Sequence, residues 1–332
     1  MLEYIQNFLF SMIRISTPLI FVAICSTISQ QAGLLNMAAE SMMLSSALAG
    51  VLFSAMFQNV WLGILCGALV SVIITLFLCY AAFVLKVDLY LMSISLNMAL
   101  LGGTVFVVYL VTGTKATTAG VINSLALGEW HIPLIEKIPF LGPIISGQNG
   151  FTYIAILMTV AVWYLLFKTK LGLRIRAVGQ NPKAAESVGI NPRRIQTLAF
   201  ALAGFVGSFG GMYLSMGYQN FFLRDMTAGR GFIGLAASTI ANAQPFGAMA
   251  MSFVFGLSTA TTNYLKPYIV DQYFLSALPF IITTVIYLVL SGWRIKQADR
   301  LMKANRARLA SINAQAQGET ADNTAEDKTG VQ

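Results

Sequence analysis

Residues 168–194 of this 332-residue chain read KTKLGLRIRAVGQNPKAAESVGINPRR, and apolar runs lie on both sides of them. The stretch holds seven basic residues against the single acid Glu186. Loops rich in Lys and Arg stay on the cytoplasmic side of a membrane, so we place this loop in the cytoplasm. A basic loop set between apolar runs indicates a membrane protein with several spans.

The centre of the loop carries the signals of one short helix. Asn181 suits the N-cap, Pro182 suits the first helical position, and Gly189 suits the left-handed stop. These positions predict a helix of about two turns over 182–188. Asn191 followed by proline repeats the start signal and opens the next apolar run.

The predicted short helix has one apolar face. Its spacing places Ala184, Ala185 and Val188 together, with Lys183 and Glu186 beside them. A small apolar face of this kind can sit in the groove of another protein. An amphipathic connector resting on lipid headgroups is the alternative that the pattern leaves open.

Composition places the whole chain in the membrane class. Apolar residues make up 57% of the chain and charged residues 10%, and the apolar residues fall in runs long enough to cross a bilayer. The net charge of +8 is concentrated in the loop and in the tail from Arg294 onward. Membrane topology explains this charge better than binding to nucleic acid does, so we expect no nucleic-acid partner.

We expect an all-α polytopic bundle with about nine transmembrane segments, and eight to ten fit the pattern. Residues 1–14 are predicted to form an interfacial N-terminal helix, and 15–293 the membrane domain with an outer loop at 113–150. Residues 294–332, first basic and then acidic, are predicted to be a largely disordered cytoplasmic tail. The nine segments lie near 15–31, 35–57, 60–85, 89–112, 151–167, 194–216, 230–244, 246–264 and 273–292.

Pairs of glycines four residues apart predict close helix packing. Gly63 and Gly67 form one such pair, and Gly207 and Gly211 form another. This spacing lets the backbones of neighbouring membrane helices approach each other.

Two polar residues interrupt the second apolar segment. Asn36 and Glu40 are four residues apart, which places them on one helical face. A carboxylate inside a membrane marks a functional site by default, although a buried Glu that locks two helices together would have the same pattern. The sequence leaves both interpretations of Glu40 open.

Three further residues complete the candidates for a substrate pathway. Ser93 and Asn97 lie in the fourth segment, where they could bind a neutral polar ligand or bond across helices. Arg230, between two glycines, starts the seventh segment, where it could snorkel or mark a half-helix gate. The candidate set is therefore Asn36, Glu40, Ser93, Asn97 and Arg230.

The chain lacks the residues of several kinds of site. It has no Gly-x-x-x-x-Gly-Lys-Ser/Thr phosphate loop, so any ATP hydrolysis must take place on another chain. His131 is its single histidine, which excludes a Ser-His-Asp centre in the spans and predicts no metal site. We therefore expect a transporter subunit and not an enzyme, with a separate power source.

The run Leu173–Asn191, continuing to Ala203-Gly204 and Gly210-Gly211, resembles the signature loop of ABC importer permeases of the branched-chain amino acid, ribose and nucleoside class. The resemblance covers roughly Pro18 to Arg294. Residues Gly33–Met43 are similar to the Asn-x-x-x-Glu-Gly-Met stretch of the nucleoside and simple-sugar subgroup, with Ser41 in place of the usual Gly. The run Met226–Phe232 is also similar to that subgroup.

The resemblance implies a coupling helix that docks onto a cytoplasmic ATPase. It implies a second, paralogous permease subunit, giving a heterodimer, and an extracytoplasmic binding protein or lipoprotein. It also implies a place in the bacterial cytoplasmic membrane, in contact with lipid. The basic tail puts the C-terminus of this multi-pass chain in the cytoplasm. No cofactor is expected on this chain, since ATP and Mg would be bound by the partner ATPase. The coupling residues would be Asn181, Pro182, Lys183, Ala184, Ala185, Glu186, Val188 and Gly189.

On this resemblance we expect the membrane permease subunit of an importer for nucleosides. The candidate pathway offers Asn and Ser more than paired charges, which suits a neutral polar solute. The alternatives are a simple-sugar or branched-chain amino acid ABC permease, an ion-coupled secondary transporter that depends on Glu40, and a purely structural subunit.

Overall fold

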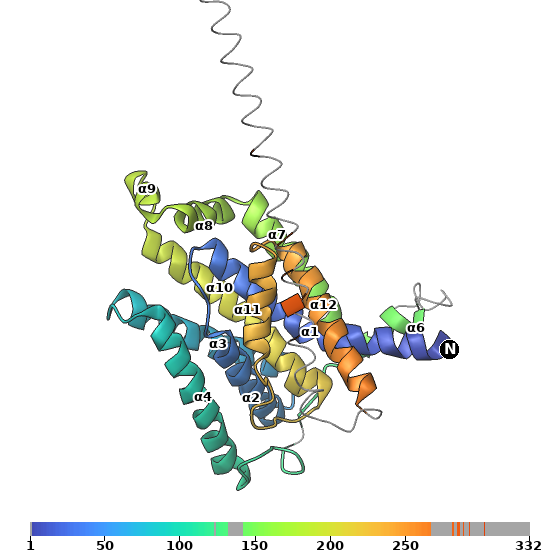
Figure 1. Ribbon diagram of the computed structural model, residues 1–332. Coiled ribbons are helices and arrows are strands. Elements are labelled where there is room, and N and C mark those ends of the chain that lie inside the picture. The colour runs from blue at the N-terminus through green and yellow to red at the C-terminus, as the bar shows by residue number, and fades with distance from the viewer. Residues whose placement is uncertain are drawn as a thin grey trace, which may run out of the picture. The chain divides into compact units, whose positions relative to one another are not determined.

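The computed structural model describes residues 2–122, 124–131 and 142–266, and single positions between 281 and 302. The described chain is mostly helical, as expected (Figure 1). Its helices are α1 (Leu2–Gln31), α2 (Ala39–Phe57), α3 (Val60–Phe83), α4 (Leu89–Thr112), α6 (Gly142–Ile145), α7 (Gly150–Lys168), α8 (Lys170–Gln180), α9 (Pro182–Ser187), α10 (Pro192–Met212), which continues into the π-helical turn η1 (Tyr213–Tyr218), α11 (Arg230–Ile240) and α12 (Pro245–Leu265).

Six of the described helices are long and apolar enough to cross a membrane, namely α1, α2, α3, α4, α7 and α10 with η1. The expected count of about nine is not confirmed. Helix α11 has 11 residues, and at 1.5 Å per residue it covers roughly 16 Å, about half of a hydrocarbon core. Helix α12 is not among the six, and the ninth predicted segment, 273–292, lies outside the described residues apart from single positions.

Helix α1 is continuous from Leu2 to Gln31, so the expected boundary between an N-terminal helix and a first span near residue 15 is wrong. Pro18 lies inside this helix and has no N–H to donate to the carbonyl of Arg14. The hydroxyl of Tyr213 donates to that carbonyl instead, at 2.9 Å. A membrane helix can contain a proline when another donor satisfies the carbonyl that the proline leaves free. The interfacial position of residues 1–14 stays a prediction.

Helices α1 and α10 lie side by side in the bundle, and the other candidate spans pack on one or both of them, except α4, which packs on α2 and α3. Helix α1 contacts α7, α11 and α12, while α10 contacts α2 and α3. The predicted close packing at the glycine pairs is confirmed. A Cβ at Gly63 would lie 2.6 Å from the Cβ of Ser54, and a Cβ at Gly211 would collide with the carbonyl oxygen of Met43. Serine hydroxyls reinforce these contacts, since Ser71 donates to the Gly204 carbonyl at 2.8 Å.

The two ends of the bundle carry different structures. Helices α8 and α9 lie together at one end (Figure 1). The hairpin of β1 (Glu129–Trp130) and β2 (Gln148–Asn149) is antiparallel and directly precedes α7, whereas α8 directly follows it. The hairpin and α8 therefore lie at opposite ends of α7.

Candidate functional site

Helix α11 begins inside the bundle and not at one of its ends. It runs parallel to the second half of α1, because Gly234 packs on Val22 and the Ser238 hydroxyl bonds that of Thr27 at 2.9 Å. Val22 lies nine residues before the end of α1 at Gln31, which is roughly 13 Å along the helix axis. The N-terminus of α11 thus lies part-way along α1, as it does in the broken helices that build substrate sites in transporters.

The start of α2 reaches a similar depth because the chain after α1 turns back along it. The Leu34 N–H donates to the Ser29 carbonyl at 3.0 Å, and Asn36 Nδ2 donates to the Ser29 hydroxyl at 3.3 Å. Asn36 is fully buried, and its Oδ1 accepts from the Ala38 N–H at 3.1 Å. The Asn36 side chain therefore fastens the segment between α1 and α2 against α1. The predicted shared helical face of Asn36 and Glu40 is wrong, because α2 begins at Ala39, after Asn36.

The carboxylate of Glu40 joins the two helix starts. Its Oε1 accepts from the Gly229 N–H at 2.8 Å, and its Oε2 accepts from the Gly231 N–H at 2.6 Å. The carboxylate lies in the first turn of α2 and on the N-terminus of α11, where helix dipoles favour negative charge. A Cβ at Gly231 would lie 2.5 Å from the Glu40 nitrogen, so this approach needs a glycine. Of the two interpretations left open for Glu40, helix locking matches these contacts.

Asn97 fastens α4 to the same place. Its Oδ1 accepts from the Ser41 N–H at 3.1 Å, and its Nδ2 donates to the Met37 carbonyl at 2.9 Å. An amide carries two N–H donors, so one of them remains for a ligand. Ser93 is buried, and its hydroxyl donates to the Leu89 carbonyl within α4 at 2.6 Å.

A cavity of about 270 Å³ lies between the start of α2, α4 and the start of α11. Met98 is 72% exposed and Phe232 is 45% exposed, so the cavity is open on one side. Small-molecule sites usually measure roughly 300–1,000 Å³, and this cavity would need a further wall to enclose a drug-sized solute. Its lining residues are Glu40, Ser41, Leu44, Ile94, Asn97, Met98, Leu101, Asp225, Gly229 and Phe232.

The structure brings two of the five pathway candidates, Glu40 and Asn97, to the cavity. Asn36 and Ser93 are buried in hydrogen bonds away from it. Arg230 does not line it either, because its Nη1 donates to the carbonyls of Met226 and Thr227 at 3.0 and 3.1 Å. Those bonds close the turn before α11.

Two cavity residues were not among the sequence candidates. Asp225 has a φ of +54° in the turn before α11, and the ring of Phe232 stands at the first turn of that helix. Phe232 ends the run Met226–Phe232, which resembles the nucleoside and simple-sugar subgroup, and Asp225 directly precedes that run. The sequence of this run therefore pointed to the region, but only the fold brings these two residues to a cavity shared with α4.

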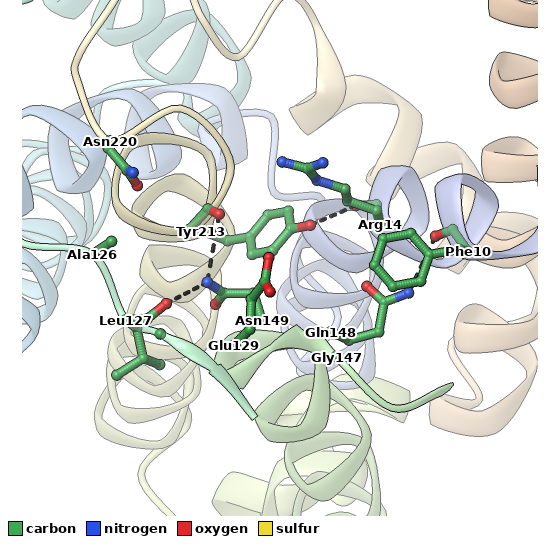
Figure 2. Close-up of a pocket in the computed structure, with 12 residues that line it drawn as sticks. Phe10, Arg14, Ala126, Leu127, Glu129, Gly147, Gln148, Asn149, Tyr213 and Asn220 are labelled. Carbon is green, nitrogen blue, oxygen red and sulfur yellow. Dashed lines mark hydrogen bonds between the residues drawn. The ribbon is translucent and has the colours of Figure 1, made fainter. Parts of the chain in front are cut away.

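A second, smaller cavity lies near the hairpin, and the amide side chains around it hold loops in place (Figure 2). Its volume is about 150 Å³, well below the usual range for a ligand site. Asn149 Nδ2 donates to the carbonyls of Leu127 and Gly217, and Gln148 Nε2 donates to the Phe10 carbonyl at 3.2 Å. These amides fasten the hairpin to α1 and η1.

The predicted short helix of the basic loop is present as α9. The Ala184 N–H donates to Asn181 Oδ1 at 3.1 Å, Pro182 opens the helix, and Gly189 has a φ of +81°. The helix ends one residue earlier than expected, since Val188 is its C-cap.

The expected apolar face of α9 is partly wrong. Ala184 and Val188 are exposed, but Ala185 is only 4% exposed and packs inward. The Ile190 N–H donates to the Ala185 carbonyl at 3.1 Å, which folds the chain after α9 back over this residue. Lys183 and Glu186 are both exposed. The surface that a partner could touch therefore contains Ala184 and Val188 without Ala185.

The basic loop contains a second helix, α8, that the sequence did not predict. Ile175 and Val178 form its buried side, and its exposed side carries Lys170 and Arg174 next to Leu173. Near its C-terminus Gly179 packs directly against the Gln31 carbonyl and Gly33 at the turn after α1. This contact joins the α8–α9 end to the chain that leads into α2.

The chain is similar to known membrane transport proteins. Residues 8–290 match the family described as "Branched-chain amino acid transport system / permease component". The "Nucleoside ABC transporter permease protein NupC" of Lactococcus lactis is 32% identical over 300 residues, 87% of this chain and 93% of that protein. The "Guanosine ABC transporter permease protein NupQ" of Bacillus subtilis is 32% identical over 296 residues, 86% and 90% respectively. The "Putative glucose ABC transporter permease protein TsgC13" of Haloferax volcanii is 28% identical over 268 residues, 78% of each chain.

Proposed function

The chain belongs to the permease components of branched-chain amino acid transport systems, and from this we propose that it is the membrane subunit of an ATP-driven importer of nucleosides. Two relatives that are 32% identical over most of their length carry the names of nucleoside and guanosine permeases. The observation that carries the proposal is the mid-depth cavity between α2, α4 and α11.

The groups in this cavity suit a nucleoside better than an amino acid. The half-exposed ring of Phe232 can stack on a nucleobase, while the spare amide N–H of Asn97 and the carboxylate of Asp225 can bond to ribose hydroxyls. Both oxygens of Glu40 are already engaged by backbone N–H groups. Among the described residues, no Lys or Arg lines the cavity, so the carboxylate end of a zwitterion would have no cationic partner there.

Because the cavity is open on one side, we propose that a second permease subunit provides the missing wall. Helix α4, which forms one present wall, lies at the edge of the bundle (Figure 1). We propose that the second subunit is a paralogue and that an extracytoplasmic protein delivers the nucleoside. We further propose that the complex lies in the bacterial cytoplasmic membrane with the C-terminus of this chain in the cytoplasm. ATP and Mg would be bound by a separate ATPase on the α8–α9 side.

A continuous chain of contacts supports coupling between α9 and the cavity. Closure of the ATPase would press on Ala184 and Val188, with α9 shaped by Asn181, Pro182 and Gly189 and flanked by Lys183 and Glu186. Movement of α8 would reach the turn after α1 through Gly179, since no side chain separates Gly179 from the Gln31 carbonyl. From that turn the chain leads in a few residues to Glu40, whose carboxylate holds the start of α11.

Uptake of labelled guanosine and uridine tests the proposed function. The chain is expressed with its partner subunits, and the phosphate-loop lysine of the ATPase is either intact or replaced. We expect uptake that is lost with the lysine and unaffected by excess ribose or leucine. Uptake that is indifferent to the lysine contradicts ATP coupling, and competition by ribose or leucine moves the substrate to that class.

Substitution of Phe232 tests the cavity itself. Stacking of a base on an aromatic ring contributes about 1–3 kcal/mol. Phe232→Ala is therefore expected to weaken nucleoside binding by roughly 5- to 150-fold, and Phe232→Tyr to preserve it. The control is Phe246→Ala, which removes a similarly exposed ring from α12, away from the cavity. Equal effects of the two alanine substitutions on half-maximal uptake would contradict a stacking role.

Substitution of α9 tests the coupling surface. Ala184→Asp places a charge on the exposed surface and is expected to uncouple ATPase activity from uptake while the protein stays folded. Ala184→Ser is the neutral control of similar size. Ala185→Asp is expected to reduce the amount of folded protein instead, because it buries a charge. Unchanged uptake and unchanged ATPase co-purification in Ala184→Asp would contradict the docking assignment.

A further inference from the structure

An apolar groove of about 510 Å³ lies between the end of α3 and the start of α10. No residue of the described helix α11 lines it. Its walls include Leu76, Phe83 and Leu198. Arg193 and Arg194, in the first turn of α10, stand at one end of it. The groove therefore has a long apolar body and a cationic mouth.

The two arginines at the mouth are available to a ligand. Both are exposed, and within the described residues neither guanidinium donates a hydrogen bond or forms an ion pair. Guanidinium groups bind phosphate oxygens through paired N–H donors. The mouth also lies at the positive N-terminal end of α10, which favours the same ligand charge.

The groove is continuous with a surface that faces lipid. Leu65, Leu69, Ile73 and Tyr80 are all more than half exposed along α3, which has the highest mean hydropathy of the six candidate spans, 2.7. Exposed apolar side chains of such a span lie against acyl chains. The groove thus opens sideways into the bilayer, with its arginines at the α8–α9 end, where the basic loop lies.

We propose that this groove binds one anionic phospholipid. The phosphate lies between Arg193 and Arg194, and an acyl chain runs past Leu198 and Ala201 between α3 and α10. Basic pockets between membrane helices on the cytoplasmic side hold anionic headgroups in this way. The proposal requires only that the chain spans a bilayer and does not depend on the solute that it carries.

Native mass spectrometry of the transporter complex tests the proposal, with phosphatidylglycerol and phosphatidylethanolamine of identical acyl chains as the probes. We expect retention of phosphatidylglycerol over phosphatidylethanolamine, and at least a tenfold loss of that retention in the double variant Arg193→Ala with Arg194→Ala. The matched control, Lys170→Ala with Arg174→Ala, removes two exposed charges from α8 outside the groove and is expected to retain the lipid. Circular dichroism verifies that each variant is folded.

A second pair of variants leaves every charge in place. Ala201→Phe fills the groove between the walls and is expected to displace the lipid, whereas Ala161→Phe adds the same ring to an exposed position of α7. Equal loss from the two charge variants means general surface attraction and overturns the proposal, as does equal retention of the two lipids. A photocrosslinker at Leu198 that reacts with another subunit instead of a lipid also overturns it and assigns the groove to a protein contact.

Discussion

Helices α10 and α4 are both apolar enough to span a membrane, but their surroundings are opposite. In the most apolar part of each, 72% of the residues of α10 with η1 are buried, against 17% in α4. The more exposed helix is also the more apolar, with a mean hydropathy of 2.0 against 1.5. Lipid tails are as apolar as Leu side chains. The hydropathy of a membrane helix therefore shows that it can lie in lipid, and does not show how closely other helices pack on it.

Glycines make the same contrast at atomic scale. Gly204, Gly207 and Gly211 of α10 each face a neighbouring helix so closely that a Cβ would meet its atoms, whereas Gly102 and Gly103 of α4 have nothing within 4 Å. Helix α10 is therefore part of a tightly packed scaffold. Helix α4 is a wall with one free side, which fits the proposed second subunit.

The largest difference is expected between a valine substitution at a closely packed glycine of α10 and one at an open glycine of α4. Gly211→Val drives a branched side chain into the Met43 carbonyl and should cost about 3 kcal/mol or more, or prevent folding. Gly102→Val, in open space on α4, should leave stability unchanged. Thermal unfolding of the detergent-solubilised protein measures both. Similar melting temperatures for the two variants would contradict the contrast between α10 and α4.

The next largest effect is expected at the junction of α2 with α11. Glu40→Ala removes the acceptor of two backbone N–H groups, and hydrogen bonds to a charged group contribute about 1.5–3 kcal/mol each. We expect faster hydrogen exchange at Gly229 and Gly231 and at least tenfold slower uptake. Glu40→Gln, which keeps one carbonyl acceptor, should lie between this variant and the wild type. Glu3→Ala is the exposed control, and unchanged exchange in Glu40→Ala would contradict the locking role.

A smaller effect is expected where α4 is fastened to the packed region. Asn97→Ala removes the bonds to Ser41 and Met37, at a cost of about 1–2 kcal/mol. Helix α4 should loosen while α10 stays protected, which hydrogen exchange resolved by peptide can measure. The neighbouring exposed Ser95→Ala is the control, since its hydroxyl bonds only within α4. Equal loosening of both helices would mean that α4 belongs to the packed scaffold.

The smallest effect is expected on the open face of α4. Met98→Ala removes a side chain that is 72% exposed, and its cost to unfolding should be within about 0.5 kcal/mol. Met43→Ala, at a fully buried position of α2, should cost roughly 2–5 kcal/mol because it leaves a cavity. Chemical unfolding in the same detergent compares the two. If Met98→Ala destabilises only the two-permease complex, the free face is the subunit interface.

Local chemistry made several features predictable. The caps Asn181 and Gly189 locate α9 to within one residue, because they act on neighbouring backbone groups. The glycine pair at Gly63 and Gly67 predicts a close approach, because helix geometry places the two on one face. Helix α8 was missed because its basic side resembles a loop, and its buried side is apparent only where it packs on the rest of the bundle.

The sequence by itself determined the class of this protein, its basic loop and its family, because composition and short-range signals decide these properties. Only the tertiary structure decided which polar residues meet. It returned the chain along α1, separated Asn36 from the cavity, set Glu40 on the start of α11 and turned Asp225 and Phe232 toward α4. These contacts join residues up to 191 positions apart. No local pattern encodes such pairs, since they depend on how complete helices pack.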